Sequence, residues 1–386
     1  MRIIIIHRSF ALVGGAERVI IDKANYLAEN GHQVKLLSYE QGAHEISYQM
    51  NSSVEYEDLD CRFFTLSKYS LPLHLIHFFQ LKRKFRQSLT QVIKAFSPNV
   101  IVLASDWTFL TKPLLKAAKE IPVICEFHNS YDHIVKNIGQ TNSGIKSIPT
   151  KVYVNNALKA LKKCAQLISL TEHDARHWEK ITNKVSVIPN PLAFFPETTD
   201  DIPKIPGRIL FVGRLNTEKR IDRLISAFSM ISSKHPAWHI TIFGEGVEKE
   251  ALERLIISLE QQNRIIIHQP TNKIIEEYKK AQFLVLSSEY EARPLVLPEA
   301  MSCGTPCISF NCPSGPAEII DNHVTGLLAK NGDIKDLAEK MEWLITHDTD
   351  REKMGKNARL AAEKYKPDVI MKEWEKVYSS ACINTK

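Results

Sequence analysis

The stretch SSEYEARPLVLPEAMSCGTPCISF, Ser287 to Phe310, carries the pattern that decides the fold. An apolar, β-rich run from Phe283 to Ser287 leads into it, and a second such run, Pro306 to Phe310, closes it. Between the two runs, Pro294 suits the first turn of a helix, and helix-forming residues follow it. The stretch therefore predicts a strand, a helix and a second strand, which is the repeating unit of a parallel sheet.

The same alternation of short apolar runs with amphipathic stretches extends along the chain in both directions. It restarts after Pro189 to Pro206, a segment rich in proline and acidic residues that we interpret as a linker. The strands expected before the linker are Arg2 to His7, Gln33 to Ser38, Asn99 to Ala104, Pro122 to Phe127, Gln166 to Leu170 and Lys184 to Ile188. The strands expected after it are Arg208 to Val212, Trp238 to Phe243, Arg264 to His268, Phe283 to Ser287 and Pro306 to Phe310. The fold class is therefore α/β, with two doubly wound domains.

Length and composition agree with two globular domains. The chain has 386 residues, more than one hydrophobic core usually supports, and 44% of them are hydrophobic and 24% charged. We expect an N-terminal domain over residues 1–190, a second domain over 191–365 and a last helical stretch over 366–386. Ligands of such sheets bind beyond the carboxyl ends of the strands, so we expect the site in a cleft between the domains.

Several classes of protein are excluded by the sequence. The seven cysteines are an odd number without C-x-x-C spacing, so we expect reduced thiols in a cytoplasmic protein. No run of about eighteen apolar residues is present, which argues against a membrane-spanning helix. The acids Asp58 and Asp60, and likewise Asp348 and Asp350, look like loop residues rather than metal ligands. We therefore expect no metal, no cofactor and no nucleic-acid partner.

Two kinds of group in the opening stretch suit a phosphorylated sugar. Backbone N–H groups of Leu295 and Val296, at the start of the helix after Pro294, can bind a diphosphate. Glu299, about two turns into the helix, can accept hydrogen bonds from ribose hydroxyls, and Glu291 in the loop can do the same for a sugar ring. For an isolated pair of glutamates, a solvated surface helix is the commoner explanation.

The residues around the two glutamates favour the binding role. From Glu291 to Ile308 the chain resembles the signature of glycosyltransferase family four, usually written E-G-F-P-L-V-x-x-E-A-M-A-x-G-x-P-V-I. The resemblance implies a GT-B fold, in which two Rossmann-like domains face each other across a cleft and the last helix, 366–386, returns to the first domain. It also implies a retaining, metal-independent transferase that moves a sugar from a nucleotide-diphosphate sugar to a hydroxyl of a glycan or lipid-linked acceptor. A further segment, Pro313 to Ile320, resembles members that build bacterial surface polysaccharides.

The resemblance extends to the first strand after the linker. The stretch RILFVGRLNTEK, Arg208 to Lys219, is similar to the family motif in which two cations, here Arg214 and Lys219, hold the donor diphosphate and stabilise the leaving nucleotide. An ordinary basic loop is the alternative. Gly244 and Gly246 end the next strand, and the resemblance assigns them to a wall of the donor site.

The first domain contributes weaker signals. Gly14 and Gly15 open a helix after the first strand, where they can receive phosphate or sugar oxygens or simply make a tight turn. They resemble the family's G-G-x-E motif, which implies that Gly15 lies near the donor phosphate. His128 follows the strand Pro122 to Phe127; a lone histidine is usually structural, but the family commonly places a substrate-facing histidine here. Asp106 is a candidate for a place near the acceptor hydroxyl.

One departure from the family signature concerns the sugar. Ala292 and Arg293 stand where Gly-Phe is usual, so Arg293 either lies by the sugar, favouring an acidic or unusual one, or points to solvent, which we expect. Other functions compatible with the residues are a sugar-nucleotide epimerase or phosphorylase, and a catalytically silent partner subunit that binds nucleotide sugars. An NAD-dependent oxidoreductase is disfavoured, because G-x-G-x-x-G is missing after the first strand.

A basic amphipathic helix is expected over Leu73 to Phe96. Such a helix can lie on anionic lipid headgroups, or it can pack on the core with solvated lysines, and the sequence leaves both open. Lipid-linked acceptors would favour the first alternative, at the inner face of the cell membrane. The cations and aromatic residues concerned are Lys82, Arg83, Lys84, Arg86, Phe78, Phe79 and Phe85.

Overall fold

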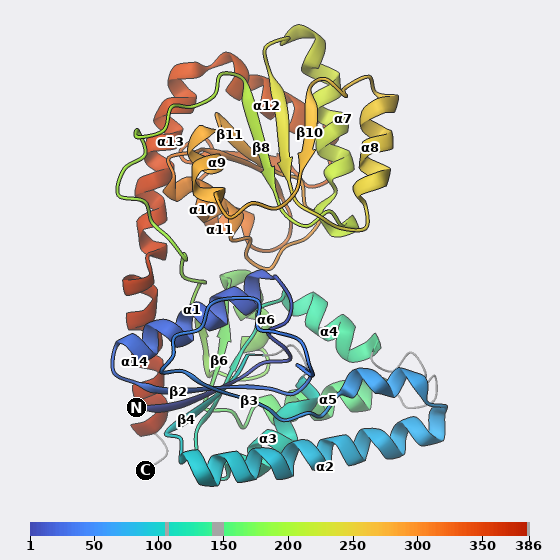
Figure 1. The fold of residues 1–386 in the computed structure, drawn as a ribbon, viewed down its shortest axis with the longest axis vertical. Coiled ribbons are helices and arrows are strands. Elements are labelled where there is room, and N and C mark those ends of the chain that lie inside the picture. Colours follow the sequence, from blue (N-terminus) through green and yellow to red (C-terminus); the bar gives the residue numbers. More distant parts are fainter. Residues whose placement is uncertain (105–107, 141–149, 384–386) are drawn as a thin grey trace. The chain divides into compact units, whose positions relative to one another are not determined.

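The computed structural model describes residues 1–104, 108–140 and 150–383 of the chain (Figure 1). These residues form two compact units: unit 1 consists of Met1–Pro189 together with Ile370–Lys386, and unit 2 of Asn190–Val369. None of the helices in the described ranges has the length and apolar character needed to cross a membrane.

Unit 1 is built on a sheet of seven parallel strands in the order β3-β2-β1-β4-β5-β6-β7. Both faces of this sheet are covered, so its central strands are runs of consecutive buried residues. In β1, Ile3 and Ile5 pack in one hydrophobic core and Ile4 and Ile6 in the other. The strands are β1 Arg2–Ile6, β2 Gln33–Ser38, β3 Glu55–Asp58, β4 Val100–Ala104, β5 Val123–Glu126, β6 Gln166–Ser169 and β7 Val185–Val187.

Helices from both ends of the chain cover one face of this sheet. α1 and α14 lie beside each other there, and Ile370, Met371, Trp374 and Tyr378 of α14 are buried in the same core as α1 (Figure 1). α2 and α3 pack on the opposite face. The helices of unit 1 are α1 Gly15–Glu29, η1 Phe63–Lys68, α2 Leu71–Phe96, η2 Thr108–Leu110, α3 Thr111–Ala118, α4 Tyr131–Gln140, α5 Thr150–Leu161, α6 Glu172–Glu179 and α14 Pro367–Ile383.

Unit 2 contains a sheet of six parallel strands in the order β10-β9-β8-β11-β12-β13. Its strands are β8 Arg208–Val212, β9 His239–Phe243, β10 Ile265–His268, β11 Phe283–Leu286, β12 Cys307–Asn311 and β13 Gly326–Lys330. Its helices are η3 Thr217–Lys219, α7 Ile221–Ile231, η4 Ser232–Lys234, α8 Lys249–Ser258, α9 Ile274–Lys280, α10 Val296–Ser302, α11 Pro316–Ile319, α12 Ile334–Thr346, α13 Asp348–Ala362 and η5 Glu363–Tyr365.

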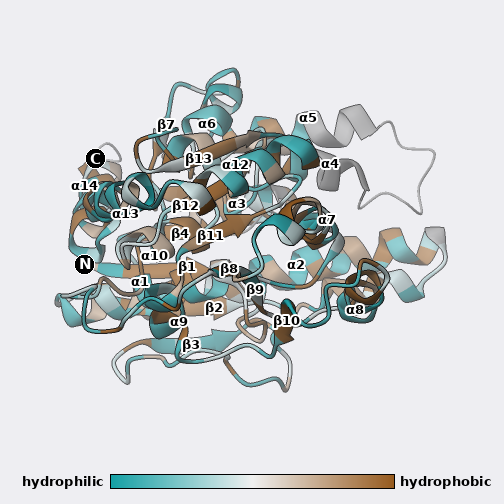
Figure 2. Ribbon diagram, turned by 90° about the horizontal axis from the view of Figure 1, so that it is seen from above, coloured by the Kyte–Doolittle hydropathy of each residue, from teal (hydrophilic) through white to brown (hydrophobic). Residues whose placement is uncertain are grey.

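The α/β class with two doubly wound sheets is confirmed. Figure 2 shows the hydrophobic residues concentrated in the strands, whereas α2 carries both hydrophobic and hydrophilic residues along its length. Strand order reverses between β1 and β4 in unit 1 and between β8 and β11 in unit 2. In sheets of this kind the ligand crevice lies beyond the carboxyl ends of the strands at that reversal. Two strands, β3 and β13, were not expected from the sequence. Both are edge strands, and β3 reads EYED, a run without apolar continuity.

Candidate active site

The loops that follow β8 and β11 in unit 2 are hydrogen-bonded to each other. Ser287 Oγ donates to the Lys219 carbonyl at 2.9 Å, and the Glu289 backbone N–H donates to the Glu218 carbonyl at 3.0 Å. The Tyr290 hydroxyl donates to Glu218 Oε1 at 2.8 Å. Because β8 and β11 are neighbours where the strand order reverses, these bonds fix the two loops at the crevice of unit 2.

A charged pair joins the same two loops. Lys219 Nζ lies 2.6 Å from Glu291 Oε1, and the two side chains are only 18% and 11% exposed. Bonds between ionised partners are short and strong, so each group holds the other in place. Arg214, on the same loop as Lys219, is exposed and makes no ion pair or side-chain hydrogen bond within the described part of the chain. The structure therefore brings together two of the predicted donor-binding residues, Lys219 and Glu291, and leaves the second predicted cation, Arg214, exposed.

Gly244 and Gly246 are required by backbone packing. A Cβ on Gly244 would lie 2.0 Å from the Gly213 carbonyl oxygen, and one on Gly246 would lie 2.3 Å from that of Leu215. The Leu215 N–H donates to the Glu245 carbonyl at 2.8 Å, which holds the loop after β9 against the loop after β8. These glycines thus shape the crevice by close packing of two loops.

The helix that was expected at Pro294 begins later. α10 starts at Val296, with Leu295 as its N-cap, so the expectation that Pro294 occupies the first turn is wrong. Glu299 consequently lies in the first turn, not two turns into the helix. It is 7% exposed, and its Oε2 accepts a hydrogen bond from the Tyr278 hydroxyl of α9 at 2.8 Å. Burial, together with the charge of Glu299, raises the pKa of Tyr278 well above its usual value, so the phenol remains a donor to the carboxylate.

Arg293 does not point to solvent, and that expectation is wrong. Its side chain is 9% exposed, with Nη1 3.2 Å from Glu318 Oε2 and Nη2 donating to the Tyr365 hydroxyl at 3.0 Å. The guanidinium carbon also lies 5.4 Å from the centre of the Tyr365 ring. The partners come from α11 and η5, distant in sequence, so the local residue pattern gave no sign of them. Arg293 is held by protein contacts in unit 2.

In unit 1, the predicted glycines open α1 as expected. Gly15 is the first residue of α1, and Gly14 is its N-cap in extended conformation. A Cβ on Gly14 would lie 2.3 Å from Glu17 Oε2, because the Glu17 side chain folds back over the helix start. Glu17 Oε1 lies 3.6 Å from His7 Nε2. Burial acts to raise the pKa of Glu17, but the hydrogen bond and the charge of His7 lower it below its usual value.

His128 lies directly beyond β5, and its side chain is 6% exposed. Its Nε2 is 3.3 Å from Glu126 Oε1, and Glu126 also pairs with Lys23 of α1. Within the described residues, neither ring nitrogen of His128 has a hydrogen-bond partner. Asp106, the other candidate in unit 1, lies outside the described residues.

Sequence reasoning missed Lys23 and Glu126, although each leaves a trace. Lys23 occupies the apolar face of α1 between Ile20 and Leu27, where a lysine is unusual. Glu126 ends β5, VICE, whose other residues are uncharged and buried. A charge on each of two core-facing elements is the signal for a buried ion pair.

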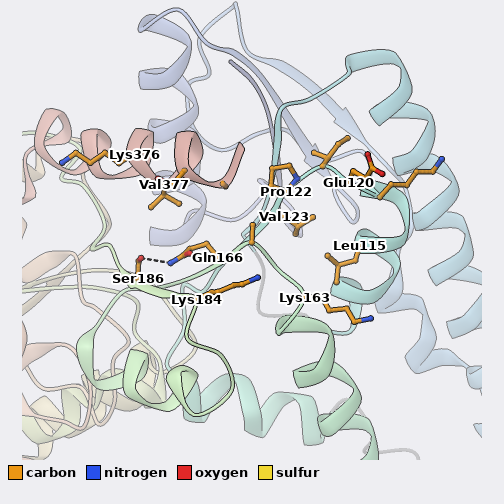
Figure 3. Close-up of a pocket in the computed structure, with 15 residues that line it drawn as sticks. Leu115, Glu120, Pro122, Val123, Lys163, Gln166, Lys184, Ser186, Lys376 and Val377 are labelled. Carbon is orange, nitrogen blue, oxygen red and sulfur yellow. Dashed lines mark hydrogen bonds between the residues drawn. The ribbon is translucent and has the colours of Figure 1, made fainter. Parts of the chain in front are cut away.

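Cavities lie apart from the predicted residues of unit 1. A cavity of about 650 Å³ is bounded by residues at the amino ends of β5, β6 and β7 and by the last turns of α14, opposite the ends that carry His128. Figure 3 shows that Lys376 extends away from Lys163 and Lys184, so the cationic groups do not converge. In unit 2, a cavity of about 370 Å³ adjoins the start of α7 and Glu289. The described residues contain no cluster of three or more His, Cys, Asp or Glu side chains able to hold a metal.

Comparison with known families covers both units. Residues 199–361 match "Glycosyl transferases group 1", and residues 13–193 match "Glycosyltransferase Family 4". An uncharacterised glycosyltransferase of Haemophilus influenzae is 25% identical over 365 residues, 94% of this chain and 95% of that protein. The amylovoran biosynthesis glycosyltransferase AmsD of Erwinia amylovora is 25% identical over 372 residues, 94% of this chain and 95% of that protein.

A third relative and two solved structures extend the likeness. A Campylobacter jejuni α-1,4-N-acetyl-D-galactosaminyltransferase, whose name specifies a glycan on diphospho-undecaprenol, is 24% identical over 368 residues, 94% of each chain. TarM of S. aureus matches with a TM-score of 0.75 at 13% identity, covering 98% of this chain and 99% of TarM. HepE of Anabaena, in complex with UDP-glucose, matches with a TM-score of 0.72 at 17% identity, covering 98% of this chain and all (100%) of HepE. The chain belongs to the group 1 and family 4 glycosyltransferases and is a glycosyltransferase of GT-B fold.

Proposed function

We propose that this enzyme transfers a sugar, with retention at the anomeric carbon, from a nucleoside-diphosphate sugar to a hydroxyl of a glycan or lipid-linked acceptor. The product would be a bacterial surface polysaccharide or glycolipid. The observation that carries the proposal is the 2.6 Å pairing of Lys219, whose loop also presents the exposed Arg214, with Glu291 on the loop after β11. Structural relatives solved with UDP or UDP-glucose, and sequence relatives named for amylovoran and undecaprenol-linked glycans, support the choice of donor and acceptor class.

The charges suit the bond that breaks. As the bond between the anomeric carbon and the diphosphate oxygen lengthens, negative charge grows on the diphosphate. Arg214 and Lys219 would stabilise that charge, assisted by the N–H groups of Leu295 and Val296 at the start of α10. Such stabilisation in a preorganised site is usually a large part of the rate enhancement. The acceptor oxygen forms the new bond on the same face, and its proton passes to an oxygen of the departing diphosphate.

The carboxylates suit the polyols of the donor. Glu291 is held by Lys219 through Oε1, and the proposal assigns its remaining hydrogen-bonding capacity to hydroxyls of the transferred sugar. Glu299, fixed through Oε2 by Tyr278, would accept a bond from the ribose. Arg293 is fully engaged with Glu318 and Tyr365, so we assign it to positioning the loop before α10 and not to selecting the sugar. His128, in unit 1, is proposed to act on the transferred sugar.

The proposed acceptor would be presented at the inner face of the cell membrane, and α2 suits that surface in part. Leu73, Ile76 and Phe79 are 49%, 53% and 66% exposed, and Arg83 continues the exposed row one turn later. Two cations that would face the lipid if the helix lay on a membrane are engaged elsewhere. Lys82 lies over the rings of Phe78 and Phe109, and burial lowers its pKa to about 8, whereas Lys84 pairs with Asp60. Hydrophobic insertion with fewer cations is therefore the contact we propose.

A donor screen tests the proposed function. Sugar conjugates of UDP, GDP, ADP and dTDP are added to the enzyme, and the melting temperature is recorded, because a ligand specific for the folded state raises it. At least one conjugate is expected to raise the melting temperature and to be hydrolysed slowly without an acceptor. Stabilisation without hydrolysis would favour the silent binding subunit. Failure of every conjugate to stabilise the protein would contradict the proposal.

A further inference from the structure

Unit 1 buries a complete ion pair for which the proposed chemistry has no direct use. Lys23 of α1 and Glu126 of β5 are each 1% exposed, and Lys23 Nζ contacts Glu126 Oε2. Lys23 Nζ also lies 3.8 Å from the ring centre of Trp374 on α14. Three elements that are far apart in sequence thus meet at one buried charge.

Stability does not account for this arrangement. Two charges that are removed from water lose their hydration, and their mutual attraction offsets this loss only when the geometry is excellent. A protein with an apolar pair of the same volume is often equally or more stable. The ring of Trp374 already provides an apolar surface against which such a pair would pack. The position of the second carboxylate oxygen indicates a different use.

Glu126 faces His128 with the oxygen that Lys23 leaves available. Oε2 is held by Lys23, and Oε1 lies 3.3 Å from His128 Nε2. Burial acts to raise the pKa of Glu126, but the charges of Lys23 and His128 lower it to about 2. The carboxylate is therefore ionised at neutral pH. The other charged groups near this site, Glu17 and His7, form their own pair at 3.6 Å.

We propose that the Lys23–Glu126 pair positions the imidazole of His128 beyond β5. Trp374 holds the Lys23 ammonium, Lys23 fixes the carboxylate, and the carboxylate attracts the ring at Nε2. Nδ1 of His128 has no hydrogen-bond partner within the described residues and is the ring nitrogen that the proposal leaves for substrate. Glu126 and Lys23 are thus positioning residues, and the inference rests on the proposed role of His128 in sugar transfer. The C-terminal helix, through Trp374, is part of the same support.

Two variants test the positioning role. Glu126→Gln removes the charge at constant shape, and Lys23→Met with Glu126→Leu replaces the whole pair by apolar side chains. The double variant is expected to melt within a few degrees of the parent or above it. In both, kcat for hydrolysis of the donor found by the screen should fall at least about tenfold with KM changed less than about threefold, since mispositioning affects the reacting step more than ground-state binding.

The matched control is Glu40→Gln. Glu40 is another buried, ion-paired carboxylate of unit 1, with its side chain 2% exposed and its Oε2 paired to Arg8. Its Oε1 accepts a hydrogen bond from the Phe64 N–H. Its kcat should stay within about twofold of the parent. An equal loss of kcat in Glu40→Gln would show a general effect of removing buried charge and would overturn the proposal.

A spectroscopic measurement separates this inference from the proposed function. The imidazole cross-peak of His128 is identified in a ¹H–¹³C NMR spectrum as the one lost in His128→Gln. It should shift in Glu126→Gln and in the double variant, and stay in place in Glu40→Gln, whether or not the parent hydrolyses any donor. The proposal would be overturned if the His128 peak did not move in Glu126→Gln. It would also be overturned if the parent were active and both variants kept kcat within about twofold of it. If the double variant does not fold, the result for Glu126→Gln decides alone.

Discussion

Lys219 and Glu291 hold each other at 2.6 Å across two neighbouring loops, so the protein itself orients the cation. Lys219→Ala removes the charge that the proposal places on the leaving diphosphate. We expect kcat of sugar transfer or donor hydrolysis to fall on the order of 10²–10³-fold, the effect of losing one preorganised stabilising group. UDP affinity, measured by calorimetry, should fall by about tenfold, in line with one lost hydrogen bond to a charged group.

Lys280→Ala is the matched control for that experiment. Lys280 also pairs with glutamates of unit 2, at 3.2 and 3.1 Å, but it lies on α9 and not on the loops at the crevice. Its kcat should remain within about twofold, because these partly buried ion pairs are not on the loops that carry Lys219 and Glu291. If Lys219→Ala kept the kcat of the parent, the assignment of Lys219 to the leaving group would be wrong.

For Arg293 we expect an effect on stability and not on catalysis, because its contacts are with the protein. Arg293→Met keeps the length of the side chain and removes the bonds to Glu318 and Tyr365. We expect a loss of about 1–3 kcal/mol of stability, the range for losing hydrogen bonds that involve a charged group. Thermal unfolding measures it, with Arg254→Met, an exposed residue of α8, as a control that should change little. An altered ranking of donor sugars with unchanged stability would instead place Arg293 in the sugar pocket.

Among elements, the strands were the most predictable and the polar partners of the site the least. Strands such as Ile3 to Ile6 are buried on both faces, so their composition alone marks them. β3 escaped prediction because an edge strand needs no apolar run, and α10 begins at Val296, two residues after the proline that was expected in its first turn. Arg293 and Lys23 find partners at Tyr365 and Glu126, and no local pattern specifies such distant pairs.

The helix α2 is the element whose surface can be tested separately. Its exposed row, Leu73, Ile76, Phe79 and Arg83, is expected to contact anionic membranes. Arg83→Ala should weaken co-sedimentation with vesicles of phosphatidylglycerol and phosphatidylcholine by about fivefold, since a cation near such a surface contributes about 1 kcal/mol. Lys162→Ala, an exposed cation at the end of α5, is the control. Equal sedimentation of the parent with neutral and anionic vesicles would contradict an electrostatic contribution.

At the scale of the whole molecule, the chain leaves unit 1, builds unit 2 and then supplies the last helix of unit 1. Ile370, Met371, Trp374 and Tyr378 of α14 are all 2% exposed or less, so they complete the core that also contains α1. Burying a large apolar side chain contributes about 1.5–3 kcal/mol, so these four contribute roughly 6–12 kcal/mol. That sum is comparable to the entire stability of a typical domain, about 5–15 kcal/mol. Removal of the end of the chain should therefore damage the unit that contains its beginning.

A chain that stops at Val369 tests this. Hydrogen exchange followed by mass spectrometry should show loss of protection in β1, β2 and β4, whereas β8, β9 and β11 stay protected, because unit 2 has its own core. The affinity of unit 2 for UDP should survive, since Arg214, Lys219 and Glu299, which are proposed to bind the nucleotide, all lie in unit 2. A chain that stops at Ile383 keeps every buried residue of α14 and should exchange like the parent. Intact protection of β1 in the shorter chain would mean that α14 adds little to the core of unit 1.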